Sequence, residues 1–284
     1  MKTKTTILVA TVVSGMLCWG GCAGHTGRIQ PAASGIDTGA AEAHEALSAV
    51  LRKHVREGGV DYAALCGDAR LPAYLARVAA TDPGAIPDAD SRLAFWLNAY
   101  NAFTLQVICD NYPVGSINDL HFGGLYVGSL TNKTIWDREF IVINGEELSL
   151  NDIEHKIVRR RFGDPRAHFA LVCASKSCPA LRAEAFEGQT LGEQLDEQAR
   201  LFFSEEQKNH FDIENKTAHL SRILDWYAGD FGDSNEAILL FVARYVSDPL
   251  AAAIQGDPAA WDIKHTDYDW SLNEQSRAVQ RSAE

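Results

Sequence analysis

Residues 92–109 are apolar on nearly every side of a helix, and this run constrains the fold more than any other segment. A helix that rests on a core keeps a polar face, whereas a helix that is apolar all round has to be enclosed. Two asparagines, Asn98 and Asn101, lie three residues apart on one face of this run. An enclosed amide costs about 1–3 kcal/mol unless it is hydrogen-bonded. The sequence therefore predicts a central buried helix whose asparagines have polar partners.

Further helices are expected on both sides of this run. Apolar residues recur at helical spacing over about 43–55, 71–79, 150–161, 191–203, 221–230 and 235–247. Asp61 can cap a short helix after Gly58-Gly59, and Thr190 with Glu193 forms a capping-box pattern. Pro249 is expected to end the helix over 235–247.

Strands are few and scattered. Phe140–Ile143 followed by Asn144-Gly145 predicts a strand and its hairpin turn. Residues 168–173 are continuously apolar, which is typical of a strand buried on both faces. A hairpin over 211–220 and a strand over 263–270 complete the set. This mixture predicts an α+β fold, a single globular domain with a central buried helix and a small, mostly antiparallel sheet.

The N-terminus is typical of an export signal. Lys2 and Lys4 precede an apolar run over 7–17 that is too short to span a bilayer. Small residues then lead to Cys22, as a lipoprotein signal peptidase requires before a lipid is attached. We therefore expect residues 1–21 to be a signal peptide and Cys22 to be lipidated. Ordinary secretion is the alternative.

The expected location is the cell envelope. Ala23 after the cysteine resembles lipoproteins of the outer membrane, so we expect an outer-membrane lipoprotein that faces the periplasm and is held to the membrane by its lipid. Residues 22–41 read as a flexible tether, 42–275 as the globular domain and 276–284 as a polar tail. The net charge of −12 excludes nucleic acid as a partner held by charge.

Polar residues that could form a catalytic site are Asn98, Asn101, Glu154, His155, His168, Cys173 and Cys178. A cysteine nucleophile needs a base, a group that orients the base, and donors for the oxyanion, and these residue types are all present. On one extended strand, His168 and Cys173 would lie on opposite faces about 17 Å apart, too far for a direct pair. Cys178 follows in a loop, so the sequence favours Cys178 as the nucleophile of a hydrolase or acyl transferase.

In this hypothesis His155 or His168 is the base, Glu154 orients it, and Asn98 or Asn101 donates to the oxyanion. No cofactor and no metal are expected at such a site. Three less specific interpretations remain open. Cys173 and Cys178 could form a disulfide, Glu154 could form a buried ion pair with Arg161 or another arginine of the 159–161 cluster, and both asparagines could be purely structural.

Other interpretations give the domain a different role. Cys66 and Cys109 could be small buried residues or a second disulfide. His155, His168, Cys173 and Cys178 could hold zinc, although none of the usual ligand spacings is present. The long loop over 113–138 could make the protein a non-catalytic envelope module that binds a peptide, a glycan or a partner protein.

Several motifs resemble one family. They are Val60-Asp61-Tyr62, the FWLNAYNA run at 95–102, Leu150–His155, the HFALVCASKSCPAL run at 168–181 and Tyr268–Asn273. The chain is similar in these motifs to the family catalogued as domain of unknown function 547, of which it would be a bacterial lipoprotein-type member. The resemblance supports the expected fold and the choice of site residues, and it brings no settled activity with it.

A papain-like fold is one form that this architecture could take. In such folds a histidine opens a buried strand and the nucleophile begins a central helix. His168 occupies the first position, but the buried helix offers Asn98 instead of a cysteine. A papain-like protein of this sequence would be an inactive binding module or would have moved its nucleophile.

Overall fold

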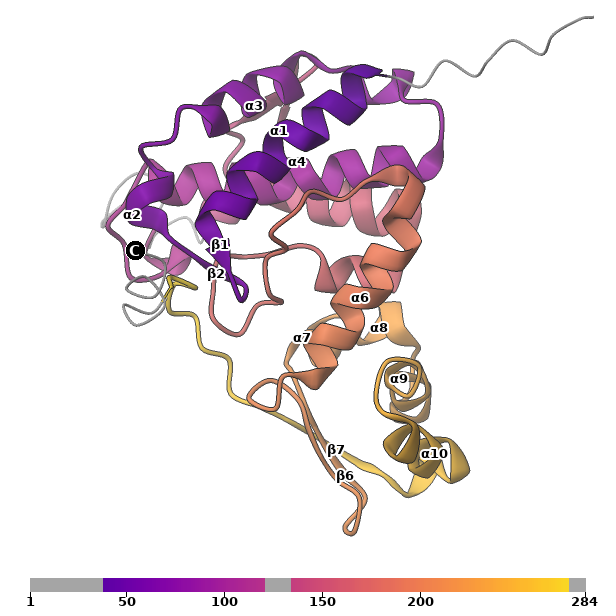
Figure 1. Ribbon diagram of the computed structural model, residues 1–284. Coiled ribbons are helices and arrows are strands. Elements are labelled where there is room, and N and C mark those ends of the chain that lie inside the picture. Colours follow the sequence, from indigo (N-terminus) through magenta and orange to yellow (C-terminus); the bar gives the residue numbers. More distant parts are fainter. Residues whose placement is uncertain (1–37, 121–133, 276–284) are drawn as a thin grey trace, which may run out of the picture. The chain divides into compact units, whose positions relative to one another are not determined.

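Helix α4 (Ala89–Cys109) is enclosed along most of its length, as the apolar run predicts. Every side chain from residue 93 to residue 108 is buried except Gln106. The Asp88 carboxylate caps the helix by accepting a hydrogen bond from the Ser91 backbone N–H at 2.7 Å. The computed structural model describes residues 38–120 and 134–275, and all structural statements concern these residues (Figure 1).

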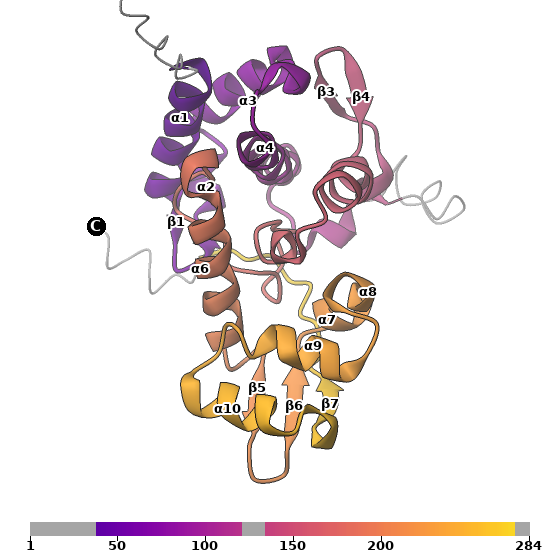
Figure 2. The ribbon, with the colours of Figure 1, turned by 90° about the vertical axis from the view of Figure 1, so that its right-hand side faces the viewer.

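A first group of elements packs around α4. It consists of α1 (Thr38–His54), β1 (Val55–Arg56), β2 (Gly59–Val60), α2 (Tyr62–Leu65), α3 (Arg70–Ala80), β3 (Ile141–Ile143), β4 (Glu146–Leu148) and η4 (Asp152–Phe162). Figure 2 looks almost along α4 and shows α1 and α3 on one side of it. Antiparallel pairing joins β1 to β2 and β3 to β4. The predicted central helix and the hairpin at Asn144-Gly145 are confirmed.

A second group of elements follows later in the chain. It consists of η5 (Pro165–Phe169), α6 (Leu191–Ser204), β5 (His210–Asp212), β6 (Thr217–Leu220), α7 (Ile223–Trp226), α8 (Ala228–Phe231), α9 (Asn235–Val242), α10 (Asp248–Gly256) and β7 (Asp262–His265). Its sheet has the order β5-β6-β7, with β6 antiparallel to β5 and parallel to β7. Single short turns of helix are η1 (Pro83–Ala85), η2 (Ile117–Asp119), η3 (Ile135–Asp137), η6 (Gly188–Thr190) and η7 (Pro258–Ala260).

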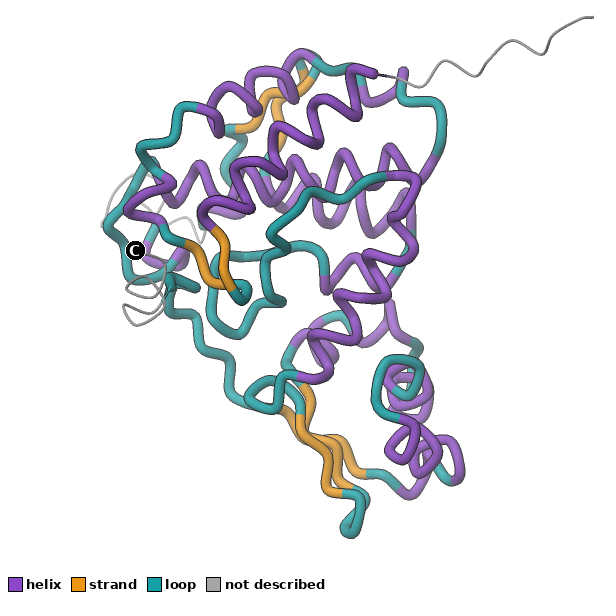
Figure 3. Tube along the Cα trace, in the orientation of Figure 1, coloured by secondary structure: helices purple, strands orange, loops and turns teal. Residues whose placement is uncertain are grey.

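Figure 3 shows helices through most of the described chain and strands in a few short stretches. The predicted α+β class is therefore confirmed. Buried side chains form two hydrophobic clusters, one around α4 and one between the β5-β6-β7 sheet and helices α7 to α10. Helix α6 contributes to both, since Leu195 belongs to the first and Ala199 to the second. The boundary between the two clusters falls between Phe169, which belongs to the second, and Ala170, which belongs to the first.

The expected strand over 168–173 is not present. Residues 165–169 form the 3-10 helix η5, and the chain is then irregular. The side-chain amide of Asn101 takes the place of a neighbouring strand: its Oδ1 accepts from Val172 N, and its Nδ2 donates to Ala170 O, each at 2.9 Å. A buried backbone needs a partner for each polar group but not a strand partner. The continuous apolar run correctly predicted that this segment is buried, but the strand that it predicted is wrong.

The helix expected over 150–161 is present with a different winding. Residues Asp152–Phe162 are π-helical, with hydrogen bonds to the fifth residue along the chain. The wider turn changes which residues share a face, so Arg161 does not lie over Glu154 as the α-helical spacing predicts. Glu154 is bound by two tyrosines instead, and the predicted Glu154–Arg161 ion pair is wrong.

Smaller differences concern helix ends. Pro249 lies at the start of α10 and does not end α9, because a proline in the first turn lacks only an N–H that would be unpaired there. The segment 221–230 divides into α7 and α8. Helix α6 begins after Thr190 without the predicted side-chain cap. The last strand is the short, parallel β7.

A disulfide joins Cys66, at the end of α2, to Cys109, at the end of α4. The sequence left these cysteines open between buried residues and a second disulfide, and the structure contains the disulfide. It closes a chain segment of 43 residues and fixes the first helices against the central one.

Several predictions fall outside the described residues. The signal peptide over 1–21, lipidation of Cys22, nearly all of the tether over 22–41, residues 121–133 of the long loop and the tail over 276–284 stay predictions. In the described ranges, 38–120 and 134–275, no helix is both long and apolar enough to cross a membrane.

We expect Asn101→Ala to lower the free energy of unfolding by about 2–4 kcal/mol, because the buried Ala170 carbonyl and Val172 N–H each lose their partner. Urea unfolding followed by circular dichroism measures the difference. The exposed Asn118 is the matched control, and its replacement by alanine should change the stability by less than about 0.5 kcal/mol. Equal stability of the two variants would contradict the role assigned to Asn101.

Candidate functional site

A cavity of about 200 Å³ lies where the two hydrophobic clusters meet. Its polar lining includes four of the seven site residues that the sequence predicts. They are Glu154, His168, Cys173 and Cys178. The remaining lining residues are Tyr100, Trp136, Asn151, Leu171, Ile223, Trp226, Tyr227, Tyr268 and Trp270. Segments far apart in the sequence therefore contribute to one cavity, which we call the thiol pocket.

Cys173 is a free, partly buried cysteine that lines the thiol pocket. Its Sγ lies 3.1 Å from Ser175 Oγ and 3.4 Å from the Tyr268 hydroxyl. Burial alone would raise the pKa of this thiol, but hydrogen bonds with Cys178, Ser175 and Tyr268 outweigh it and lower the pKa to about 7. The next residue, Ala174, has a φ of 59°, an unfavourable conformation for a residue with a Cβ. A sharp turn thus follows a thiol that is about half ionised at pH 7.

Cys178 differs from Cys173 in nearly every respect. Only 4% of its surface is exposed, and its Sγ accepts a hydrogen bond from the Cys173 backbone N–H at 2.7 Å. Burial, together with the neighbouring Cys173 thiol, raises its pKa well above the ordinary value. The sequence favoured Cys178 as the nucleophile because an extended strand would have kept Cys173 away from His168. That strand is absent, and the geometry favours Cys173.

His168 is buried against the wall of the thiol pocket and stacks on Tyr227, with 4.1 Å between ring centroids. Its Nε2 lies 2.7 Å from Asp230 Oδ2. Burial lowers the pKa of His168, and the nearby Asp230 carboxylate opposes this only in part. The imidazole is therefore neutral at pH 7 and can accept a proton.

Asp230, at the end of α8, is a residue that the sequence did not single out. Arg159 binds both of its oxygens, with Nε 2.6 Å from Oδ2 and Nη2 3.0 Å from Oδ1. The hydrogen bonds from Arg159 lower the pKa of Asp230, so the carboxylate is ionised beside His168. No spacing in the sequence relates residue 230 to residue 168, so this pair could not be found without a structure.

Glu154 is buried and accepts a hydrogen bond on each carboxylate oxygen. Tyr227 donates to Oε1 at 2.6 Å and Tyr100 donates to Oε2 at 3.1 Å. Burial raises the pKa of both tyrosines, and the carboxylate raises it further, so both hydroxyls stay protonated donors. Tyr227 also stacks on His168, which connects Glu154 to the imidazole through one side chain.

Three predicted site residues do not line the thiol pocket. His155 is 39% exposed at its side chain, and its Nδ1 lies 3.1 Å from Arg159 Nη1. The Asn98 side-chain amide makes two hydrogen bonds with the Phe186 backbone: it donates to the carbonyl O and accepts from the N–H, each at 2.8 Å. Asn101 is committed to Ala170 and Val172. These asparagines hold segments together and have no donor directed into the pocket, so their assignment as oxyanion donors is not supported.

Cys173 and Cys178 are both free, so the disulfide that the sequence left open is not formed here. The zinc interpretation finds no support either, since His155 binds Arg159 while His168 binds Asp230. Among the residues that the structure describes, no three His, Cys, Asp or Glu side chains are arranged to hold a metal ion.

Aromatic rings form the outer rim of the thiol pocket. Trp226 lies 4.8 Å from Tyr268 and 5.8 Å from Trp270, measured between ring centroids, and Tyr268 lies 4.5 Å from Trp270. Trp226 is 47% exposed. Trp136, from the long loop over 113–138, also lines the pocket. Exposed aromatic faces of this kind bind sugars, planar groups and cations.

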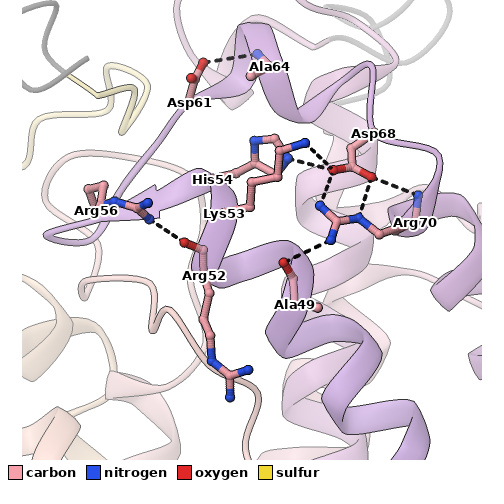
Figure 4. A network of polar contacts seen from close by, with 9 residues as sticks. All are labelled: Ala49, Arg52, Lys53, His54, Arg56, Asp61, Ala64, Asp68 and Arg70. Atoms are coloured by element: carbon pink, nitrogen blue, oxygen red, sulfur yellow. Dashed lines mark hydrogen bonds and ion pairs between the residues drawn. The ribbon is translucent and has the colours of Figure 1, made fainter. Parts of the chain in front are cut away.

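A second polar cluster lies away from the thiol pocket (Figure 4). The Asp68 carboxylate is nearly enclosed and binds Arg70 at 2.6 Å, His54 at 2.9 Å and Lys53 at 3.4 Å. Its pKa is held well below the ordinary range, first by Arg70. This cluster ties the end of α1 to the start of α3, and its groups satisfy one another, so it is structural.

Residues 87–203 match the family model described as "Protein of unknown function, DUF547". The match supports the family suggested by the motifs, and it spans α4, Glu154, His168 and both free thiols. Comparisons with curated proteins and with solved structures gave no match. A papain-like fold is therefore not confirmed.

The lowered pKa predicts how the Cys173 thiol reacts as pH changes. Because the thiolate is the reactive form, the rate of alkylation by iodoacetamide should rise with pH and reach half of its maximum near pH 7. Peptide mapping by mass spectrometry separates Cys173 from Cys178, which should react much more slowly. Ser175→Ala should move the midpoint upward, because one stabilising hydrogen bond is lost. A midpoint near the ordinary thiol pKa of about 8.5 would contradict the assignment.

Proposed function

We propose that the protein is a cysteine-dependent acyl transferase or hydrolase in which Cys173 is the nucleophile. One observation carries the proposal: a thiol with a pKa of about 7 lines the same pocket as the buried His168, which is held by Asp230. A structural cysteine would not be expected to combine a lowered thiol pKa with a histidine–aspartate pair in the same pocket.

In the first step the Cys173 thiolate attacks the carbonyl carbon of an ester, thioester or amide. The carbonyl–leaving-group bond breaks, the leaving group takes a proton from water as it departs, and the acyl group stays on the sulfur as a thioester. Because a large share of this thiol is ionised at pH 7, the attack needs no direct proton transfer to histidine. This agrees with the absence, among the described residues, of a hydrogen bond between His168 and either thiol.

In the second step water or an acceptor hydroxyl or amine attacks the thioester, and His168 takes its proton. Neutral imidazole is the form that this step needs, and burial favours that form. Asp230 binds Nε2 and fixes the ring, so Nδ1 is the nitrogen that we assign to proton transfer. Contacts in an empty site often tighten only when substrate is bound.

Tyr268 takes the oxyanion role that the sequence gave to an asparagine. Its hydroxyl already lies 3.4 Å from the Cys173 sulfur. Burial raises the pKa of this phenol, as do the two neighbouring thiols, so it remains a donor at neutral pH. Glu154 is a positioning residue in this scheme, because it holds Tyr227 against the His168 ring and both of its oxygens accept from tyrosines.

The aromatic rim supports a second candidate function, a non-catalytic module that binds a peptide or a glycan. Its basis is Trp226, which stacks on Trp270 and lies tilted against Tyr268 while nearly half of its surface stays exposed. In the enzyme proposal the same rim binds the substrate outside the reacting carbonyl.

We also propose that the protein acts in a bacterial envelope, as a lipoprotein of the outer membrane. The support is the N-terminal sequence, with its short apolar run and the small residues before Cys22. The disulfide between Cys66 and Cys109 is compatible with an oxidising compartment.

The enzyme proposal predicts a covalent intermediate. With p-nitrophenyl acetate we expect a burst of nitrophenol and an acetyl group on Cys173, located by peptide mapping. Cys173→Ala should show neither. His168→Gln should still acylate, but release of the acetyl group should slow by about 10²–10⁴-fold.

The control for His168 is His210→Gln, because the exposed His210 in β5 lies outside the thiol pocket and its replacement should leave both steps within about twofold. Acetylation of Cys178 in place of Cys173 would contradict the assignment of Cys173 as the nucleophile. Saturable binding of a glycan or peptide without any acylation would favour the binding module.

Lipidation predicts that Cys22→Ser changes the location of the protein. The wild type should fractionate with membranes and carry a lipid on its N-terminal cysteine, while the variant should lose the lipid and the membrane association. Cys18→Ser is the matched control and should change neither. An unmodified N-terminus in the wild type would remove this proposal and leave the enzyme proposal untouched.

A further inference from the structure

The two free cysteines are in contact. Cys178 Sγ accepts the Cys173 backbone N–H at 2.7 Å, and the two thiols are close enough for each to change the ionisation of the other. Both line the thiol pocket. The acyl-transfer proposal uses one of these thiols and gives no role to the other.

The chain between them is a tight turn that brings residue 178 back to residue 173. Cys178 N donates to Ser175 O at 3.2 Å, and Lys208 Nζ donates to Cys178 O at 2.7 Å. Lys208 is itself held by Glu205. A disulfide needs sulfurs that can approach to bonding distance without movement of the backbone, and this turn already places one sulfur against the backbone of the other cysteine.

The two thiols are also unlike in the way that disulfide exchange requires. Cys173 is accessible from the pocket and acidic, so it can attack a disulfide and can leave again as a thiolate. Ser175 and Tyr268 stabilise its sulfur in that form. Cys178 is buried and stays protonated until a disulfide forms beside it.

We propose that Cys173 and Cys178 form a redox-active dithiol that exchanges with low-molecular-weight disulfides, with Cys173 the attacking thiol and Cys178 the resolving thiol. The inference rests on the contact between the Cys178 sulfur and the Cys173 backbone and on the unequal burial of the two cysteines, and it does not depend on acyl transfer.

The reaction balances with the small disulfide as the oxidant. The Cys173 thiolate attacks one sulfur of the disulfide, a bond to that sulfur forms, and the other half leaves as a thiolate. Cys178 then gives up its proton and attacks the Cys173 sulfur, which releases the second half as a thiolate. Two protein thiols are oxidised to one disulfide, and one small disulfide is reduced to two thiols.

The first test follows the mixed disulfide. Reduced full-length protein is mixed with glutathione disulfide at pH 7, quenched with acid and mapped by mass spectrometry. In the wild type we expect glutathione on Cys173 only transiently, followed by the Cys173–Cys178 disulfide. In Cys178→Ser the glutathione adduct on Cys173 should persist, with a lifetime at least about tenfold longer.

Cys173→Ser is the matched variant and should form no adduct at Cys178, because that thiol is enclosed and protonated. A stable glutathione adduct on Cys173 in the wild type would overturn the proposal, as would first attack by Cys178. The wild-type map alone decides this, so the test holds even if a variant does not fold.

Failure here is distinguishable from failure of the proposed function. Acetylation of Cys173 by p-nitrophenyl acetate is measured on the same reduced wild-type sample. If the wild type is acetylated on Cys173 but keeps its glutathione adduct, the dithiol proposal is wrong and the nucleophile proposal stands. If it forms the Cys173–Cys178 disulfide but is not acetylated, the nucleophile proposal is wrong and the dithiol proposal stands. The oxidised form should not acetylate at all, since its sulfur carries no thiolate.

Discussion

The bond between Asn101 and the 170–172 backbone is the constraint on which the site depends. Helix α4 is apolar on nearly all sides, so a segment that packs on it finds few polar partners. One amide inside that helix satisfies both Ala170 O and Val172 N. The chain is thereby held as an irregular segment with Cys173 one residue beyond the last bond, at the pocket and not in a sheet.

The position of this segment between two hydrophobic clusters explains why a pocket exists. Phe169 packs with the second cluster while Ala170 and Leu171 pack with the first. Interdigitated side chains fill each cluster, but polar groups cannot be buried there without partners. Glu154 and His168 lie at the boundary, where Tyr227 supplies a hydrogen bond to one and a stacked ring to the other.

Patterns of neighbouring residues predicted the structural features that depend on neighbouring residues. Periodicity found the helices and turn residues found two hairpins, because each depends on residues near in sequence. The prediction of a strand over 168–173 was wrong because the backbone of this segment is hydrogen-bonded to a side chain about 70 residues away. Glu154 lines the thiol pocket, but its partners are two tyrosines and not Arg161, since spacing cannot reveal a π-helix. Asp230 and Trp226 had no sequence signal, because tertiary packing alone brings Trp226 to the pocket and Asp230 to His168.

In the oxidising compartment proposed above, a thiolate-forming cysteine is exposed to oxidation, and the second free cysteine beside it bears on that problem. The features that make Cys173 nucleophilic also make it the sulfur most easily oxidised, and oxidation beyond the sulfenic acid is irreversible. A second thiol in contact can capture the first oxidation product as a disulfide before further oxidation. Cys178 is suited to this because burial keeps it from reacting on its own. The same pair can thus preserve a catalytic thiol and switch it off, so acyl transfer and disulfide exchange are compatible uses of one site.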